Sequence, residues 1–202
     1  MEIPDEVAIM TLPKVILFPQ ALLPLYIFEP RYREMLKQSL ENQRMFAVAL
    51  PNSGSSSKPN RIAGVGLIRA CVDKPDGTSN LILQGVSRVR FTDFVQEKPF
   101  YVGRIEILST EESDALEVEA LSVKVLEMIG NMHDSGQIQA EGILKFLNDI
   151  TDYDALADIV TYSFIEDVAR KQEILETLNL RQRLQKVIVS LRQQGASGPK
   201  LG

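Results

Sequence analysis

The chain has 202 residues, of which 45% are hydrophobic, and its formal net charge is −5 at pH 7. That length allows one large or two small domains with an ordinary hydrophobic core. The longest apolar stretch near the start, residues 15–28, is interrupted by Pro19, Gln20 and Pro24, so it is too broken to cross a bilayer. The first residues are acidic where a signal peptide carries Lys or Arg, and we expect a cytoplasmic protein.

Cys71 is the single cysteine and His133 the single histidine, which excludes an intrachain disulfide and a zinc site of the usual Cys/His kind. We expect Cys71 to be a small buried residue, because free thiols usually are. His133 lies near an expected helix end and lacks a nucleophile for a triad, which favours a surface capping role. No metal ion and no cofactor are expected.

Three short strands are expected before residue 30, at residues 7–12, 15–17 and 22–28. In the last of them, LLPLYIF, both faces of a pleated strand are apolar. Such a strand should be covered on both sides, either by its own fold or by a partner. A helix should begin near Pro30, since apolar residues then recur at helical spacing up to Leu40.

A short strand at residues 46–50 precedes the small and polar segment 51–60, which we expect to be a mobile loop. Residues 62–72 and 80–91 then form a long β-hairpin, because Pro75, Asp76 and Gly77 between them suit a tight turn. Three glycines within these strands predict bulges, bends or close backbone approach; they are Gly64, Gly66 and Gly85.

A strand at residues 101–108 closes the first half, which holds about six strands and one helix. This pattern predicts a small, mostly antiparallel barrel. From residue 109 the period of the apolar residues changes from about two to about 3.6, which indicates a new subdomain. Four helical stripes follow, with capping boxes expected at residues 109–112 and 151–154 and a cap at Asn179. We expect a bundle of four or five helices over residues 111–194 and a disordered tail at residues 195–202.

Three collinear blocks resemble the N-terminal domain of Lon-type ATP-dependent proteases. They are LPKVILFPQALLPLYIFEPRYREML, the hairpin GVGLIRACVDKPDGTSNLILQGVSRVRF, and LADIVTYSFIEDVARKQEILETLNLRQRLQKVI. The resemblance implies an α+β fold with a PUA-like β subdomain over residues 1–110, followed in the chain by the helical bundle. It also implies substrate recognition in protein quality control. In full-length Lon proteases an ATPase and a peptidase follow, whereas this sequence ends, so we expect a stand-alone protein.

Hydrolytic chemistry has no support in the residues. A nucleotide-hydrolysing loop needs Gly-Lys-Ser/Thr, and this string is absent. Gly64 and Gly66 lack the third glycine of a dinucleotide fingerprint. Residues 55–58 spell Ser-x-x-Lys, as in a serine–lysine dyad, but they stand in the polar loop, where nothing would fix their geometry. We therefore expect no catalytic residue and no enzyme activity.

Two kinds of surface remain as candidates for binding. Four arginines could converge on one face and bind an anion, although a solvated face balanced by acidic neighbours is the simpler interpretation; they are Arg69, Arg88, Arg90 and Arg104. Apolar residues are concentrated around the opening strands, and those left exposed would engage polypeptide; the candidates are Phe18, Leu22, Leu25, Tyr26, Phe28, Tyr32, Phe100 and Tyr101.

The favoured hypothesis is a non-enzymatic module that binds unfolded or partner protein, with a protease or chaperone supplied in trans. The alternative is an RNA-binding PUA-like module. Residues 111–167 hold fourteen acidic residues and only two lysines, and this local charge of −12 would repel phosphates, so no nucleic acid is expected. A third hypothesis is an orphan hydrolase using Ser57 or Lys58. Oligomeric state cannot be inferred from these patterns.

Overall fold

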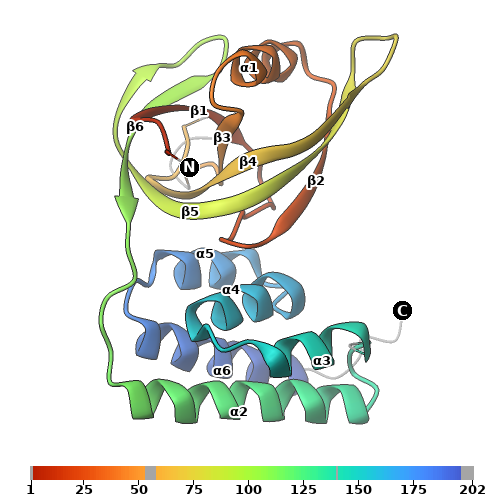
Figure 1. Cartoon of the computed structure of the whole chain (residues 1–202), viewed down its shortest axis with the longest axis vertical. Helices are drawn as coiled ribbons and strands as arrows, with labels where there is room; N and C mark the ends of the chain where they lie inside the picture. Colours follow the sequence, from red (N-terminus) through yellow and green to blue (C-terminus); the bar gives the residue numbers. More distant parts are fainter. Residues whose placement is uncertain (1, 53–57, 140, 197–202) are drawn as a thin grey trace. The chain divides into compact units, whose positions relative to one another are not determined.

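The computed structural model describes residues 2–52, 58–139 and 141–196. Its internal contacts divide the chain into two compact units, Met1–Leu108 and Ser109–Gly202. The first contains strands and one helix, and the second contains helices alone among its described residues (Figure 1). The sequence boundary expected between residues 110 and 111 stays a prediction. The fold class is thus mixed α+β, with a six-stranded sheet and six helices in the described residues.

The first unit is built on one sheet with the strand order β2-β5-β4-β3-β1-β6. Its elements are β1 (Glu6–Thr11), β2 (Leu22–Ile27), α1 (Pro30–Glu41), β3 (Met45–Ala49), β4 (Ile62–Asp73), β5 (Ser79–Gln96) and β6 (Tyr101–Leu108). β1 and β3 pair in parallel, and the other pairs are antiparallel. The long β5 also pairs with β6, so the pairings return from β6 to β5. β2 pairs with β5 alone among the described strands.

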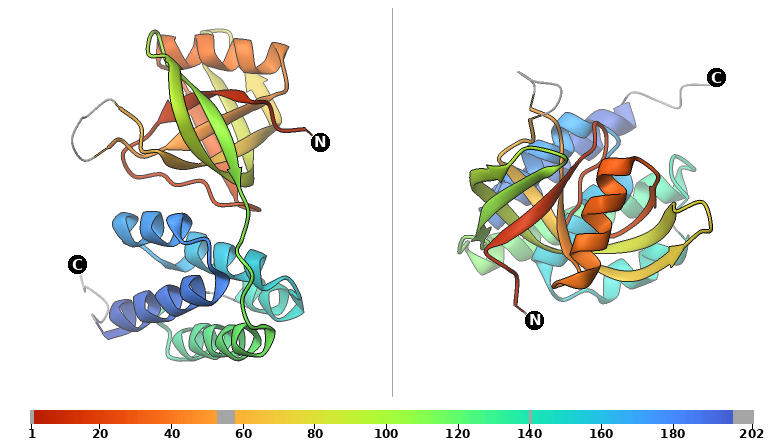
Figure 2. Two further views of the ribbon diagram at one scale, coloured as in Figure 1. Left: turned by 90° about the vertical axis from the view of Figure 1, so that its left-hand side faces the viewer. Right: turned by 90° about the horizontal axis from the view of Figure 1, so that it is seen from above.

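One consequence of this order is that β2 lies outside the ring of pairings formed by β5, β4, β3, β1 and β6. α1 lies across one end of the strands (Figure 2). It buries Tyr32, Met35 and Leu36 against the core, as its stripe predicts. The PUA-like assignment itself stays a prediction.

The β4–β5 hairpin follows the turn chemistry of the sequence. The N–H of Gly77 donates to the carbonyl of Lys74 at 2.9 Å. Gly77 has a positive φ of 78°, a backbone conformation that is strained for residues with a side chain. Asp76 accepts hydrogen bonds from the N–H and the hydroxyl of Thr78 at 3.0 and 2.7 Å. These bonds hold the pKa of the Asp76 carboxyl below its ordinary value. The predicted hairpin is confirmed.

The strand predicted at residues 15–17 is wrong. This segment runs without strand pairing, with Leu17 and Phe18 fully buried. Its backbone presses against the hairpin, because a Cβ at Gly64 would overlap the carbonyl of Leu17 and one at Gly85 would overlap that of Phe18. The close backbone approach that these glycines predicted is therefore present. It replaces the strand pairing expected for residues 15–17.

The second unit contains five helices in its described part. They are α2 (Ala115–Asp134), α3 (Glu141–Asp149), α4 (Tyr153–Phe164), α5 (Val168–Glu176) and α6 (Leu180–Ala196). α2 and α6 lie side by side (Figure 1). Leu184, Val187 and Leu191 of α6 are buried, as their spacing predicts. No helix within the described ranges is long and apolar enough to span a membrane.

Some helix starts differ from the sequence prediction, and one of the five described helices of this unit had no predicted stripe. The cap of α2 is Asp114, which accepts from the N–H of Glu117, so no capping box forms at residues 109–112. Asp152 caps α4, and Asn179 accepts from the N–H of Gln182 as expected. The sequence showed no row of apolar residues at helical spacing for α5, because one of its three buried residues is the polar Gln172. Asp167 caps α5 by accepting from the N–H of Arg170, so three acidic residues of this unit are helix caps, a position that favours negative charge.

A buried ionic cluster lies where α4 and α6 meet the first residues of this unit. Arg183 is fully buried; its guanidinium pairs with Asp154 and, at 3.7 Å, with Asp158, which is 1% exposed. The same side chain donates to the carbonyl of Thr177 at 2.8 Å and to Thr110 Oγ1 at 3.3 Å. Every charge in the cluster therefore has an opposite charge beside it, which a buried charge requires.

Two predicted flexible segments fall largely outside the described residues. Residues 53–57 of the polar loop lie outside them, including the serines of the Ser-x-x-Lys string. The ends of that loop are held together, since Pro51 and Pro59 form a bridge and the N–H of Asn52 donates to the carbonyl of Lys58 at 2.7 Å. Of the tail predicted at residues 195–202, residues 195 and 196 belong to α6, and residues 197–202 lie outside the described part.

Candidate functional site

The candidate site is the outer face of three neighbouring strands, β2, β5 and β4. Strand register places their residues in rows across this face. Pro24 lies opposite Ile82, which lies opposite Ala70. In the next row Tyr26 lies opposite Asn80, which lies opposite Val72. Because side chains alternate along a strand, the residues two positions apart in these rows share one face.

This face is apolar and open to water. Leu22 is 56% exposed, Tyr26 49%, Phe28 58% and Val72 64%. We call the following seven residues the apolar face: Leu22, Pro24, Tyr26, Phe28, Ala70, Val72 and Ile82. Burying a side chain of this size stabilises a fold by about 1.5–3 kcal/mol, and these side chains forgo much of that gain. Contiguous exposed apolar residues of this kind mark interaction sites.

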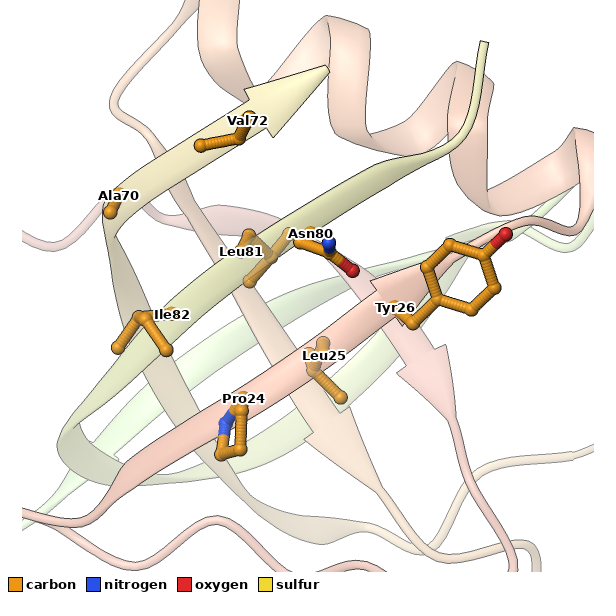
Figure 3. A pocket seen from close by; sticks show the side chains of 8 residues that line it. All are labelled: Pro24, Leu25, Tyr26, Ala70, Val72, Asn80, Leu81 and Ile82. Carbon is orange, nitrogen blue, oxygen red and sulfur yellow. The ribbon is translucent and has the colours of Figure 1, made fainter. Parts of the chain in front are cut away.

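A shallow pocket of about 390 Å³ lies within this region. Figure 3 shows the side chains of Pro24 and Tyr26 from β2, Ile82 from β5, and Ala70 and Val72 from β4 around it. Its floor is the middle strand β5. A volume of this size suits one or two apolar side chains of a ligand rather than a large cofactor.

One end of the apolar face is held in place by aromatic contacts. The rings of Tyr26 and Phe28 stack with centroids 5.7 Å apart. The ammonium group of Lys74 lies over the Tyr26 ring, 4.7 Å from its centroid. A cation over an aromatic face is attracted by the ring quadrupole, so this contact favours the exposed position of the Tyr26 ring.

The structure separates the eight predicted binding residues into three groups. Leu22, Tyr26 and Phe28 lie on the apolar face. Leu25 and Tyr101 are partly buried and pack against the core, Leu25 on the inner side of β2 and Tyr101 on β6. The other three are buried; they are Phe18, Tyr32 and Phe100. Tyr32 and Phe100 nevertheless line, with Tyr101, a second pocket of about 730 Å³ that is separate from the apolar face.

The three buried residues stabilise the fold of the first unit. Phe18 lies beneath Gly85, where its backbone excludes any Cβ. The Tyr32 hydroxyl donates to the carbonyl of Thr11 at 3.0 Å and accepts from its N–H at 3.1 Å. Burial raises the pKa of the Tyr32 hydroxyl, which keeps it neutral and able to donate. Phe100 belongs to the same core cluster as Tyr32.

The four arginines do not form one cationic face. Arg90 pairs with Glu106 at 3.0 Å, and Arg104 pairs with Glu6 at 2.9 Å. Arg88 was expected on a solvated face beside Arg90, and this is wrong, since only 4% of Arg88 is exposed. Arg69 donates from Nε to the side-chain oxygen of Gln84 at 2.5 Å. The balanced-surface interpretation therefore holds for Arg90 and Arg104.

Sequence reasoning missed the half of the apolar face that comes from β4 and β5. Ala70, Val72 and Ile82 were assigned to the hairpin and were not among the predicted binding residues. The sequence LLPLYIF did indicate such a surface, because both faces of this strand are apolar and each needs an apolar surface to pack against. The inner face meets the core, whereas its outer face, with those of its neighbours, remains uncovered.

Other chemistry finds little support in the described part of the chain. No group of three or more His, Cys, Asp or Glu residues there could hold a metal ion. Cys71 is partly buried rather than fully buried; burial and the neighbouring Asp73 carboxylate raise the pKa of its thiol, which disfavours the reactive thiolate. His133 lies in the last turn of α2.

Comparison with known proteins identifies the family of this chain. The family model of the ATP-dependent protease La (LON) substrate-binding domain matches residues 6–193. The chain is 26% identical over 191 residues to a Lon protease of Dictyoglomus thermophilum and 27% identical over 193 residues to one of Trichlorobacter lovleyi. These matches cover 92% and 93% of this chain. The chain spans only 24% of the length of each of these relatives.

Two solved structures share the fold. The N-terminal domain of the Mycobacterium avium complex Lon protease matches with a TM-score of 0.77 at 17% identity, covering 93% of this chain and 98% of the other. A Lon N-terminal domain protein from Xanthomonas campestris matches with a TM-score of 0.65 at 18% identity, covering 91% of this chain and 97% of the other. At these identities the likeness concerns the fold alone.

Proposed function

Because the chain belongs to the family of ATP-dependent protease La (LON) substrate-binding domains, we propose that it is a polypeptide-recognition module that holds its substrate on the apolar face. The substrate is an unfolded protein or an unfolded segment of a partner protein, within protein quality control. The observation that carries the proposal is the uncovered row of apolar side chains on β2, continued by Val72 of β4.

The chemistry of this surface fits an unfolded chain. Such chains expose apolar side chains that a folded protein buries, and they adopt extended conformations readily. The apolar face presents alternate residues of three strands, so its side chains repeat at the spacing of an extended ligand. The pocket beside Tyr26 accepts one larger side chain of that ligand. Recognition of this kind depends on apolar surface and not on one sequence.

The module performs no hydrolysis in this proposal. The family match concerns the substrate-binding domain, and the chain spans about a quarter of the length of the relatives it matches. ATP-driven unfolding and peptide cleavage then belong to ATPase and peptidase machinery that receives the bound polypeptide. The predicted cytoplasmic location stays part of this proposal.

Titration of a permanently unfolded polypeptide tests the proposal. Fluorescently labelled, reduced and carboxymethylated α-lactalbumin should bind the protein with a rise in anisotropy, whereas native α-lactalbumin should not. The double variant Tyr26→Ser, Val72→Ser should weaken binding about tenfold or more, because both side chains supply apolar contact area.

Leu116→Ser is the matched control for that titration. Leu116 is a leucine on α2 with 76% exposure, in the other unit of the chain, and its replacement should leave binding unchanged. The proposal fails if the unfolded and the native protein bind equally. It also fails if both variants weaken binding to the same extent.

A further inference from the structure

A cation lies at each end of the apolar face, and one of them, Lys74, also interacts electrostatically with the Asp76 carboxylate of the turn. At one end, Arg69 is hydrogen bonded to Gln84, which lies opposite Leu22 in the register. At the other end, Lys74 stands over the ring of Tyr26. Both cations are exposed, and neither belongs to an ion pair formed within the described residues.

Acidic side chains near this face are turned away from it or engaged elsewhere. Asp73 accepts from the Ser79 hydroxyl at 2.7 Å, and Ser79 is buried on the opposite side of the hairpin. Asp76 is bonded to Thr78 in the turn. Glu29, just after β2, pairs with Arg31 at 2.9 Å. The residues that point out from the three strands on this face include none with negative charge.

From this arrangement we propose that the preferred ligand is a short extended apolar segment with an acidic group at each end. The inference rests on the proposed function and specifies its substrate class. Arg69 of β4 and Lys74, the first residue after β4, are five residues apart, a separation of about 16 Å for an extended backbone. An extended ligand of about five apolar residues spans this distance and brings its flanking carboxylates to the two cations.

A second copy of this chain is a poor occupant of the same surface. A two-fold interface would bring the apolar face against itself. It would also place Arg69 and Lys74 of one copy near the same cations of the other, without acidic residues to separate them. Like charges brought together in this way disfavour association. The charge pattern therefore selects a ligand of opposite sign.

A set of labelled peptides tests the inference. Each has the same five apolar residues in the centre and is flanked on both sides by two glutamates, two glutamines or two lysines. We expect the glutamate-flanked peptide to bind about fivefold more tightly than the glutamine-flanked one, and the lysine-flanked peptide to bind most weakly. The differences should shrink at high salt, because the charges are exposed and screened.

Charge variants locate the effect. Arg69→Gln and Lys74→Gln should each remove part of the preference for the glutamate-flanked peptide over the glutamine-flanked one. Lys74→Gln should also weaken the binding of both peptides slightly, because it removes the contact with the Tyr26 ring. Lys145→Gln, which removes an exposed lysine from α3 of the other unit, should change neither value.

The outcomes separate the two proposals. Equal binding of all three peptides, or a preference for lysine, overturns the charge inference and leaves polypeptide recognition standing. Failure of every peptide and of unfolded α-lactalbumin to bind overturns both. If sedimentation shows a dimer that Tyr26→Ser dissociates, the occupant is a second copy of the chain and the inference is overturned.

Discussion

Each of the two units contains side chains in an energetically unfavourable environment, apolar ones in water in the first unit and charged ones in the interior of the second. The first unit leaves leucine, valine and aromatic side chains of its apolar face in water, although burying each would stabilise it by about 1.5–3 kcal/mol. The second unit buries Arg183 and Asp158, although taking an ion out of water costs several kcal/mol.

The two features differ in whether their own unit compensates their cost. Arg183 finds two carboxylates and several hydrogen-bond acceptors among its neighbours, so packing of the helices accounts for it. The apolar face finds no such compensation in the first unit. We therefore interpret the buried cluster as structural and the exposed face as a binding surface.

The largest effect is expected from breaking the buried cluster. Arg183→Leu leaves Asp158 buried without its cation and should lower the free energy of unfolding by about 3–5 kcal/mol. Arg181→Leu removes only an exposed pair with Glu117 and should cost less than about 1 kcal/mol. Chemical denaturation followed by far-UV circular dichroism gives both values.

A double variant sharpens this result. Arg183→Leu combined with Asp158→Leu should lose less stability than Arg183→Leu alone, because no unpaired charge is left at position 158. A loss for Arg183→Leu no greater than that for Arg181→Leu would contradict the structural role of the cluster.

The next effect concerns the backbone contact beneath the apolar face. Gly85→Ala should destabilise the first unit by about 3 kcal/mol, since the new Cβ would overlap the carbonyl of Phe18. Gly130→Ala in α2 meets no atom within 4 Å and should stabilise the protein by up to about 1 kcal/mol. Thermal and denaturant unfolding should give opposite signs for the two substitutions; equal signs would count against the packing described.

Two adjacent leucines on β2 contrast its two faces. Leu23 is buried in the core, and Leu23→Ala should cost about 2–3 kcal/mol of stability. Leu22 lies on the apolar face, and Leu22→Ala should change stability by less than about 0.5 kcal/mol while it weakens polypeptide binding. Unfolding and anisotropy measured on the same two proteins check both halves. If Leu22→Ala is as destabilising as Leu23→Ala, the outer face is part of the core.

The smallest effect is expected from the pH dependence of an exposed ion pair in the second unit. A hydrogen bond from Lys186, and a second from Arg170, lower the pKa of Glu173 from its ordinary value of 4.5. A lowered folded-state pKa stabilises above the unfolded value, and this contribution is lost as the pH falls through the folded value. It should stay below about 1 kcal/mol, because solvent screens the pair.

Glu173→Gln measures that contribution. The difference in free energy of unfolding between the original protein and the variant should shrink from about pH 6 to about pH 4. A difference that grows as the pH falls would have the wrong sign.

Local chemistry made much of the fold predictable. The turn at Asp76 and Gly77, the helix that starts at Pro30, and the stripe of α6 depend on residues close in sequence. The strand expected at residues 15–17 failed because its conformation is set by distant glycines on β4 and β5. α5 was missed because tertiary packing buries a glutamine there.

The candidate site was predictable in part. The apolar character of β2 was visible, and three of the eight candidate residues lie on the apolar face. Alternation alone could not decide which face of β2 meets the core, since Leu22 and Leu23 are equally apolar. The contribution of Ala70, Val72 and Ile82 depends on strand order, which places β2 beside β5 and not beside β1. Long-range pairing of this kind has no local signal.

Binding of polypeptide to the apolar face is tested most directly by NMR, with the backbone amide chemical shifts of the protein followed during titration with an unfolded polypeptide. If the apolar face binds polypeptide, the largest shifts fall on β2, on the end of β4 around Val72 and on the start of β5 around Ile82. Amides of the buried cluster around Arg183 then remain unchanged. Shifts confined to the helices, or absent throughout, would contradict the account.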